Sequence, residues 1–307
     1  MITVTILGAN GFVGRAVCKT ALDKGYAVRA VSRRDWATDL QVTKIIEPHP
    51  EQADDLFSES DWVVNCIGRA HVMDAEDEQA ALARYRTVNR DLSLQLADKA
   101  ERAGVTRFVQ ISSVAAVRST SASGEIIDDS TNPSPDRLYG IAKLEADEAL
   151  LARKNPSMRI ACLRPPALLG PDPTGFVGKF ARMAHKGVPL PLGAVRNARS
   201  FMAVANLADA ALKAAAQGMQ GAYIVTDSPP VSVAQLYHAM LKAAGYGHRI
   251  FPLPSSLLTV AANIALAARK DSLLGDAAYS GARFAKEAHW TPAIGMEQAL
   301  EEMMASL

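Results

Sequence analysis

Two side chains with complementary chemistry stand at helical spacing, a phenol at Tyr139 and an ammonium at Lys143. Residues at i and i+4 share one face of a helix, so the pair should lie together. A nearby positive charge favours phenolate and lowers a tyrosine pKa from about 10 towards the range of a general acid or base. Tyr139 can then give a proton to a ketone oxygen or take one from an alcohol. Ser113 follows an apolar run and offers a hydroxyl that can hold the same oxygen.

A glycine-rich motif near the N-terminus offers a place for a phosphate group. Gly8, Gly11 and Gly14 form G-x-x-G-x-x-G directly after the apolar run 4–7 and at the start of a predicted helix. Such glycines let the main chain approach a pyrophosphate, and the helix N-terminus adds free N–H groups and a partial positive charge. We therefore expect this turn to bind a dinucleotide through Gly8, Asn10, Gly11, Phe12, Val13 and Gly14.

The end of the second predicted strand, Ser32-Arg33-Arg34, bears on the choice between two cofactors. A dinucleotide-binding unit that uses NAD usually places an acid here for the ribose 2′-hydroxyl, whereas an arginine suits the 2′-phosphate of NADP. Two guanidinium groups can form charge-assisted bonds to that phosphate, which favours NADP. Asp35 follows directly and takes the role of the acid if the strand ends later, so NAD stays open.

The elements that must position these residues alternate between strand and helix. Apolar runs predict strands at 4–7, 26–31, 61–67, 107–111 and 159–163, separated by helices at 12–24, 85–103 and 139–154. Gly25 and Gly104 close the helices that precede them. This alternation predicts a parallel sheet. Ser113 then lies at the carboxyl edge of the sheet, where open α/β sheets bind their ligands.

The alternation breaks after residue 164, where proline and glycine become frequent. We therefore predict an α/β fold, a Rossmann doubly wound parallel sheet with a smaller C-terminal substrate-binding lobe. The Rossmann domain takes residues 1–164, with 200–227 returning to it, and the lobe takes 165–199 and 228–307. A length of 307 residues suits one domain with a lobe of this size.

Composition narrows the partners. With 33 basic and 32 acidic residues and no long basic run, nothing predicts binding to nucleic acid. Cys18, Cys66 and Cys162 are too scattered for a disulfide framework or a metal site and are interpreted as buried thiols. The uncharged stretch 250–268 contains prolines and predicts a packed helix after Pro254, not a membrane span. The chain begins as a strand with no leader-like segment, which indicates a cytoplasmic protein.

Taken together, the motifs resemble those of the extended short-chain dehydrogenases/reductases, the NAD-dependent epimerase/dehydratase family. The glycine turn, Ser113, Tyr139 and Lys143 match, and Asn89 falls where the family keeps a helix asparagine near the active site. The resemblance implies that Tyr139 exchanges the proton, that Lys143 tunes its pKa and binds the ribose, and that Ser113 holds the substrate oxygen. The predicted catalytic set is therefore Ser113, Tyr139, Lys143 and Asn89.

Further motifs are similar to those of bacterial nucleotide-sugar enzymes of the UDP-glucose 4-epimerase type, and above all of UDP-4-keto-6-deoxy-HexNAc 4-reductases. They are the segments 65–73, 164–166, 190–193 and 199–201. The resemblance implies that Arg199 and Ser113 bind the substrate, with Arg199 on the UDP phosphates. It also implies a homodimer that pairs the helices near 89–103 and 139–153. The cofactor contacts expected beyond the glycine turn are Ser32, Arg33, Arg34, Cys66, Ile67, Gly68, Tyr139, Lys143 and Pro166.

Three functions remain open at this point. The leading hypothesis is an NAD(P)-dependent reductase, in which NADPH delivers a hydride to the C4 ketone of a nucleotide-linked sugar while Tyr139 protonates the oxygen. The alternative is a UDP-sugar 4-epimerase that oxidises and re-reduces one carbon with retained NAD. Arg33 and Arg34 make this alternative less favoured, because they suit NADP. A non-catalytic NAD(P)-binding sensor or assembly protein could share the scaffold, since fold alone does not establish function.

Overall fold

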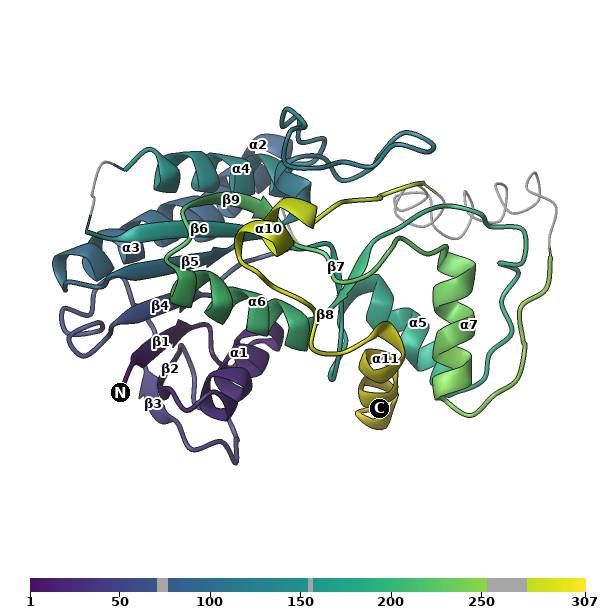
Figure 1. Cartoon of the computed structure of the whole chain (residues 1–307), viewed down its shortest axis with the longest axis horizontal. Coiled ribbons are helices and arrows are strands. Elements are labelled where there is room, and N and C mark those ends of the chain that lie inside the picture. The colour runs from purple at the N-terminus through teal and green to yellow at the C-terminus, as the bar shows by residue number, and fades with distance from the viewer. Residues whose placement is uncertain (71–76, 154–156, 253–274) are drawn as a thin grey trace.

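The computed structural model describes residues 1–70, 77–153, 157–252 and 275–307, and its largest element is a seven-stranded sheet (Figure 1). All neighbouring strands run parallel. In spatial order they are β3 (Thr43–Ile46), β2 (Ala27–Ser32), β1 (Thr3–Leu7), β4 (Trp62–Asn65), β5 (Arg107–Ile111), β6 (Arg159–Arg164) and β9 (Gly221–Ile224). The chain builds outward from β1 first to one side and then to the other. This reversal confirms the predicted doubly wound Rossmann sheet.

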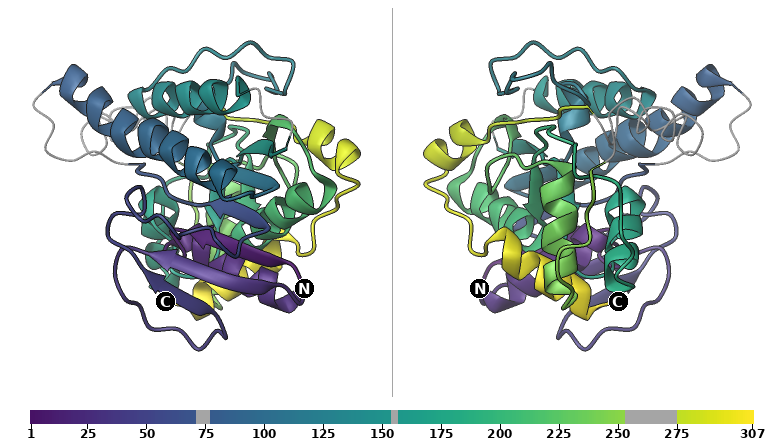
Figure 2. Two further views of the ribbon diagram at one scale, coloured as in Figure 1. Left: turned by 90° about the vertical axis from the view of Figure 1, so that its left-hand side faces the viewer. Right: turned by 90° about the vertical axis from the view of Figure 1, so that its right-hand side faces the viewer.

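Helices cover both faces of the sheet (Figures 1 and 2). Because successive side chains of a strand point to opposite faces, each strand serves two apolar cores. One core lies between the sheet and the helices α1 (Phe12–Asp23) and α6 (Val204–Gln217). The other lies between the sheet and the helices α3 (Leu92–Arg102) and α4 (Leu138–Leu151).

The helical segment before β5 differs from the single helix predicted at 85–103. It starts earlier, as α2 (Glu78–Arg86), where the Asp77 carboxylate caps the N-terminus by accepting the Ala80 N–H. It then widens into a π-helical turn (Thr87–Asp91) before continuing as α3. Such π turns frequently occur at functional sites. Hydrophobic periodicity cannot reveal a turn of this kind, because the helix continues through it.

A third core belongs to the C-terminal half and lies beside the carboxyl edge of the sheet (Figure 1). Two short parallel strands, β7 (Ala167–Leu169) and β8 (Phe201–Ala203), form its small sheet. Three helices pack there, α5 (Gly175–His185), α7 (Val233–Ala243) and α11 (Met296–Ala305). The short α10 (Ala282–Glu287) packs elsewhere, because Phe284 and Trp290 join the core under the large sheet.

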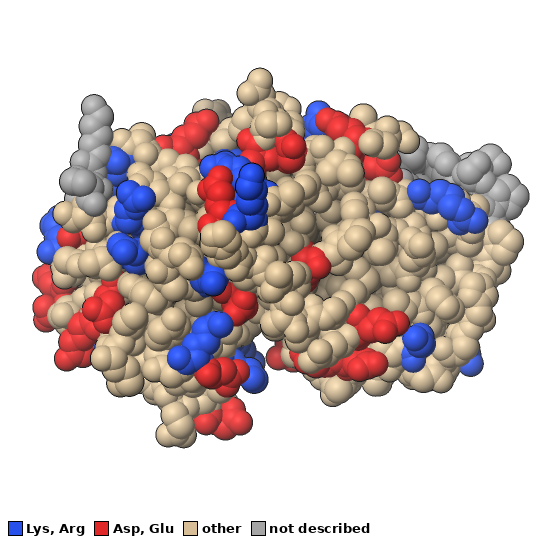
Figure 3. Space-filling model, viewed as in Figure 1, with Lys and Arg blue, Asp and Glu red and all other residues tan. Residues whose placement is uncertain are grey.

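Charges of both signs are interspersed on the face shown in Figure 3. The described helices include none that is both long and apolar enough to cross a membrane. The helix predicted after Pro254 falls within 253–274 and so lies outside the described residues.

Candidate active site

The glycine turn joins β1 to α1 in a geometry that only small residues allow. Gly8 has a φ of +72°, and a Cβ on Gly14 would stand 2.2 Å from the Gly8 carbonyl oxygen. Helix α1 begins after its N-cap, Gly11, which accepts the N–H of Arg15 at 2.9 Å. The N–H groups of the first turn therefore have no partner inside the helix. A pyrophosphate fits this turn, because the glycines admit it and the free N–H groups can bind it.

At the end of β2 the acid and the two arginines behave differently. The Asp35 carboxylate accepts a bond from Lys44 Nζ at 2.9 Å and one from the Trp36 N–H at 2.8 Å. These bonds, the one from Lys44 first, lower the pKa of Asp35. Arg33 and Arg34 are exposed, and neither guanidinium bonds to any residue that the structure describes. Asp35 is thus bonded to Lys44 of β3, while Arg33 and Arg34 are both available to a ligand.

Helix α4 brings the predicted phenol and ammonium together. The Nζ atom of Lys143 lies 6.0 Å from the ring centroid of Tyr139, but its hydrogen bond goes to the main-chain oxygen of Ile111 at 2.9 Å. The hydroxyl of Ser113 accepts the Ala115 N–H at 3.2 Å and is within hydrogen-bonding reach of the Tyr139 phenol. Tyr85 packs edge-on against the same phenol ring.

Burial dominates the electrostatics of this pair. It raises the pKa of Tyr139 to about 12, and the hydrogen bond with Ser113 only partly opposes that rise. It lowers the pKa of Lys143 to about 8, although the charge of Asp147 acts in the opposite direction. The sequence predicted a lowered phenol pKa. The structure shows the reverse, because loss of solvent disfavours phenolate and the ammonium is directed towards Ile111.

The loop after β4 links the glycine turn to this pair. A Cβ on Gly8 would stand 3.3 Å from Ile67, and one on Gly68 would stand 3.2 Å from Lys143 Nζ. Asn89, in the π turn, clamps the same loop: its Oδ1 accepts the Arg69 N–H at 2.9 Å, and its Nδ2 donates to the Arg69 carbonyl at 3.1 Å. The predicted catalytic asparagine therefore holds main chain in place in this structure.

Pro166 and Arg199 are the remaining predicted contacts for cofactor and substrate. Pro166 is buried and stands two residues after the end of β6. Arg199 precedes β8, is 8% exposed, and donates to the Gly275 carbonyl at 2.8 Å. Burial lowers the pKa of Arg199, and the like charge of Arg137 adds to that shift. Because Arg137 is the N-cap of α4, two cationic side chains approach the helix end that carries Tyr139.

Sequence reasoning missed a buried ionic group behind the site. Asp147, one turn beyond Lys143 on α4, is fully buried and accepts bonds from Ser112 Oγ at 2.9 Å and Arg164 Nε at 2.8 Å. Burial raises the pKa of Asp147, while Arg164 opposes the rise. The helical spacing to Lys143 was visible in the sequence. The partners were not, because they come from two different strand ends.

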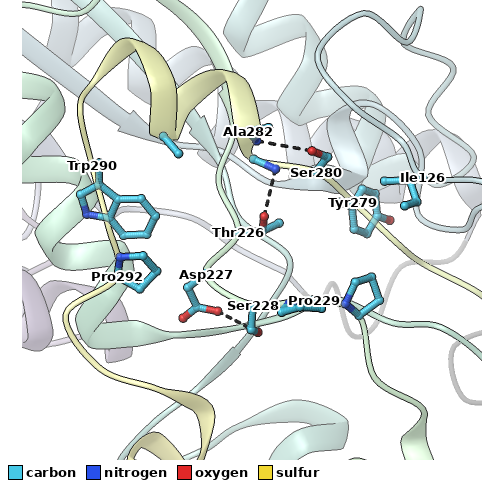
Figure 4. Close-up of a pocket in the computed structure, with 13 residues that line it drawn as sticks. Ile126, Thr226, Asp227, Ser228, Pro229, Tyr279, Ser280, Ala282, Trp290 and Pro292 are labelled. Carbon is cyan, nitrogen blue, oxygen red and sulfur yellow. Dashed lines mark hydrogen bonds between the residues drawn. The ribbon is translucent and has the colours of Figure 1, made fainter.

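A separate hollow of about 380 Å³ lies between α10 and the segment after β9 (Figure 4). Trp290 and Pro292 line one side, Tyr279 and Ile126 lie opposite, and Asp227 and Ser228 lie between the two sides (Figure 4). None of its lining residues belongs to the predicted site. Among the described residues, no group of three or more His, Cys, Asp and Glu side chains is placed to hold a metal ion.

The Rossmann sheet with its glycine turn and the Tyr139–Lys143 pair define the class: an NAD(P)-dependent enzyme of the short-chain dehydrogenase/reductase type. The chain belongs to the NAD-dependent epimerase/dehydratase family, whose sequence profile matches residues 4–225. It is 31% identical to a UDP-glucose 4-epimerase of Vibrio cholerae, over 82% of this chain and 79% of that protein.

Two further comparisons bear on the fold and on the range of chemistry among relatives. The chain is 30% identical to a ceramide reductase of Caulobacter vibrioides, over 68% of this chain and 59% of that one. The crystal structure of a UDP-glucose 4-epimerase of Thermotoga maritima with UDP-glucose superposes with a TM-score of 0.80. That match covers 99% of this chain and 98% of the other at 20% identity, and it shows the shared fold.

Proposed function

We propose that this protein is an NADPH-dependent reductase of a nucleotide-linked 4-keto sugar. The observation that carries the proposal is the arrangement at the end of β2, where Asp35 is bound to Lys44 while Arg33 and Arg34 are free. This arrangement favours a 2′-phosphate over a 2′-hydroxyl. A reductase consumes external NADPH, whereas an epimerase transfers a hydride from the sugar to its own NAD and returns it to the sugar.

The cofactor is assigned to the groups that surround the glycine turn. The first-turn N–H groups of α1 hold the pyrophosphate, and Ser32, Arg33 and Arg34 surround the 2′-phosphate. Lys143 binds the ribose on the nicotinamide side. The nicotinamide half is bordered by Cys66, Ile67, Gly68 and Pro166. When bound, NADPH supplies the hydride.

The chain's own residues supply the proton and the orientation. Ser113 holds the ketone oxygen of the substrate, and Tyr139 donates a proton to that oxygen as the hydride arrives. A phenol with a pKa near 12 is protonated at neutral pH, which suits a proton donor. Asn89 holds the loop that borders the site. Arg199, with Arg137 nearby, binds the diphosphate of the nucleotide.

The sugar nucleotide is inferred from relatives. The Vibrio cholerae and Thermotoga maritima proteins are both UDP-glucose 4-epimerases, and the latter structure contains UDP-glucose. We infer a homodimer formed through α3 and α4, which sedimentation would reveal as twice the mass of 32.7 kDa. We assign the protein to the cytoplasm, where NADPH and sugar nucleotides meet.

A second candidate is a UDP-sugar 4-epimerase with retained NAD. The 31% identity to the Vibrio cholerae enzyme over most of both chains favours it. In that case Tyr139 removes a proton from the C4 hydroxyl and later returns it. The two candidates share every predicted catalytic residue and differ in whether the cofactor leaves the protein.

A turnover assay tests the proposal. The purified protein is incubated with NADPH and a panel of UDP-linked 4-keto sugars, and loss of NADPH is followed by its absorbance. The reductase consumes NADPH only when a 4-keto sugar is present, and Tyr139→Phe slows the consumption by about 10²-fold or more. Purification with bound NAD, together with interconversion of UDP-hexoses and no use of NADPH, would instead establish the epimerase.

A further inference from the structure

Two buried amides face each other across the middle of the sheet. Asn65 ends β4 and Gln110 lies on β5, and the two residues are direct partners in the strand register. Both side chains point to the face covered by α3 and α4, and both are 0% exposed. Their neighbours on that face, such as Phe108 and Leu96, are apolar. Polar groups in such a core are destabilising unless they are hydrogen-bonded, so the presence of two amides here needs an explanation.

The hydrogen bonds of the pair run in one fixed direction. Oδ1 of Asn65 accepts the Ile67 N–H at 3.1 Å, and because a main-chain N–H can only donate, this bond fixes the amide orientation. Nδ2 of Asn65 must then face Gln110, where it donates to Oε1 at 2.8 Å. The Gln110 amide in turn directs its Nε2 to the Ile111 carbonyl, at 3.2 Å.

Both ends of this chain of bonds reach the candidate active site. The Ile111 carbonyl that receives Gln110 also receives Lys143 Nζ, at 2.9 Å. On the other side, Nδ2 of Asn65 reaches Ser93 Oγ at 3.3 Å, and that hydroxyl donates to the main-chain oxygen of Asn89 at 3.1 Å. Asn89 is the residue that clamps the 66–69 loop. The amide pair thus bonds to the Ile111 carbonyl, which also accepts Lys143. It holds the 66–69 loop directly at the Ile67 N–H, and it reaches Asn89 through Ser93.

We propose that Asn65 and Gln110 are positioning residues. Their paired amides hold the Ile111 carbonyl and the 66–69 loop, and through them Lys143, in the positions that the cofactor requires. The inference rests on the proposed cofactor site. Neither amide touches cofactor or substrate, since both are enclosed between the sheet and α3.

Asn65→Asp tests the direction of the bonds with almost no change of shape. Its carboxylate cannot donate to Gln110, so the Gln110 amide must turn and present Oε1, an acceptor, to the Ile111 carbonyl. A misplaced Lys143 would lose its hydrogen bond to the ribose. We therefore expect NADPH to bind about tenfold more weakly or worse, the factor that follows from losing one hydrogen bond to a charged group. We also expect faster hydrogen exchange in the 65–70 segment, measured by mass spectrometry on the protein without cofactor.

A double variant separates positioning from stability. Asn65→Leu with Gln110→Met removes both amides, so neither amide is left buried without the other, and only the partly buried Ile67 N–H loses its acceptor. The double variant should therefore unfold in urea nearer to the wild type than Asn65→Leu or Gln110→Met alone. Its NADPH affinity should stay about tenfold or more below that of the wild type, and its 65–70 segment should still exchange faster. Thr5→Val is the matched control. It removes the partly buried hydrogen bond that the buried Thr5, on the same sheet, makes with Ser60 Oγ away from the site, and this variant should bind NADPH as the wild type does.

The outcomes are distinct. If the double variant regains stability, NADPH affinity and slow exchange together, the amides serve packing alone and the proposal is overturned. If the wild type binds neither NADPH nor NADH, the cofactor assignment fails. The exchange measurement still decides the fate of the network, because it requires no ligand.

Discussion

The ε-ammonium of Lys143 donates to the main-chain oxygen of Ile111 at 2.9 Å. Helix α4 supplies the lysine and strand β5 supplies the carbonyl, so the bond ties the helix of the predicted catalytic pair to the edge of the sheet where ligands bind. The lysine is 2% exposed and so has little freedom to move. Its charge, more than its position, is therefore open to change by pH.

The first prediction concerns pH and NADPH binding. Burial lowers the pKa of Lys143 to about 8, so its ammonium is present below that pH and is lost above it. NADPH should therefore bind progressively more weakly as pH rises through about 8, in fluorescence titrations from about pH 6.5 to about pH 9.5, roughly one and a half pH units on either side of the midpoint. In Lys143→Met the affinity should be lower and independent of pH in this range. A wild-type profile as flat as that of the variant would contradict the role given to the lysine.

The same group has the opposite effect on folding. Its folded pKa lies below the ordinary value of 10.5, so between about pH 8 and 10.5 the unfolded chain binds the proton more tightly. This contribution to the free energy of unfolding is least favourable below pH 8 and increases as pH rises to 10.5. Urea unfolding of wild type and Lys143→Met across this range isolates it, because only the wild type should show the increase.

The second prediction concerns the proton donor. Tyr139→Phe keeps the ring that packs against Tyr85 and removes the hydroxyl near Ser113. We expect kcat to fall by about 10²- to 10⁴-fold, the usual contribution of a general acid, with the affinity for NADPH nearly unchanged. Steady-state kinetics and cofactor titration on the same preparation provide the check. A variant with half the wild-type kcat would exclude Tyr139 as the donor.

The third prediction concerns cofactor selectivity. Arg33→Ala with Arg34→Ala should weaken NADPH binding by about 10- to 100-fold, since each guanidinium can form charge-assisted bonds to the 2′-phosphate. NADH binding should change little. Arg102→Ala, which removes an exposed arginine at the end of α3, is the control for net charge. Equal losses for NADPH and NADH would show that the arginines do not read the phosphate.

The fourth prediction concerns the buried ion pair of Asp147 and Arg164, whose side chains are 1% and 9% exposed. Asp147→Leu should destabilise the protein by about 3–5 kcal/mol, because it leaves a guanidinium buried without its carboxylate. Adding Arg164→Met should recover much of that loss. Lys242→Ala, which breaks an exposed pair with Glu297, should have no measurable effect in the same urea titrations.

Local patterns predicted much of the fold. The strands that became β1, β2, β4, β5 and β6 were predicted within a few residues, because apolar runs bounded by glycine carry their own information. Gly25 and Gly104 both have positive φ where they end helices, as expected. The exposed β3 and the glycine-led β9 were not assigned as strands. Both are four residues long and take their conformation from pairing with a neighbour.

Many contacts of the candidate site could not be predicted from the sequence, for a similar reason. The turn and the Tyr139–Lys143 pair are local in sequence and could be found by spacing. The Asn65–Gln110 pair joins residues 45 positions apart, and Asp147 meets Arg164 from another element. A polar residue at the end of an apolar strand was the only available indication. Only the strand register shows that two such residues meet.

Isotope transfer from the cofactor to the sugar distinguishes a reductase from an epimerase. NADPH that carries deuterium at the transferable position of its nicotinamide is incubated with the protein and a UDP-linked 4-keto sugar, and the product is examined by NMR. A reductase places deuterium on C4 of the sugar, with one NADPH oxidised per product formed. Absence of label at C4, with UDP-hexoses interconverted by protein that keeps its own NAD, would contradict the reductase and identify an epimerase.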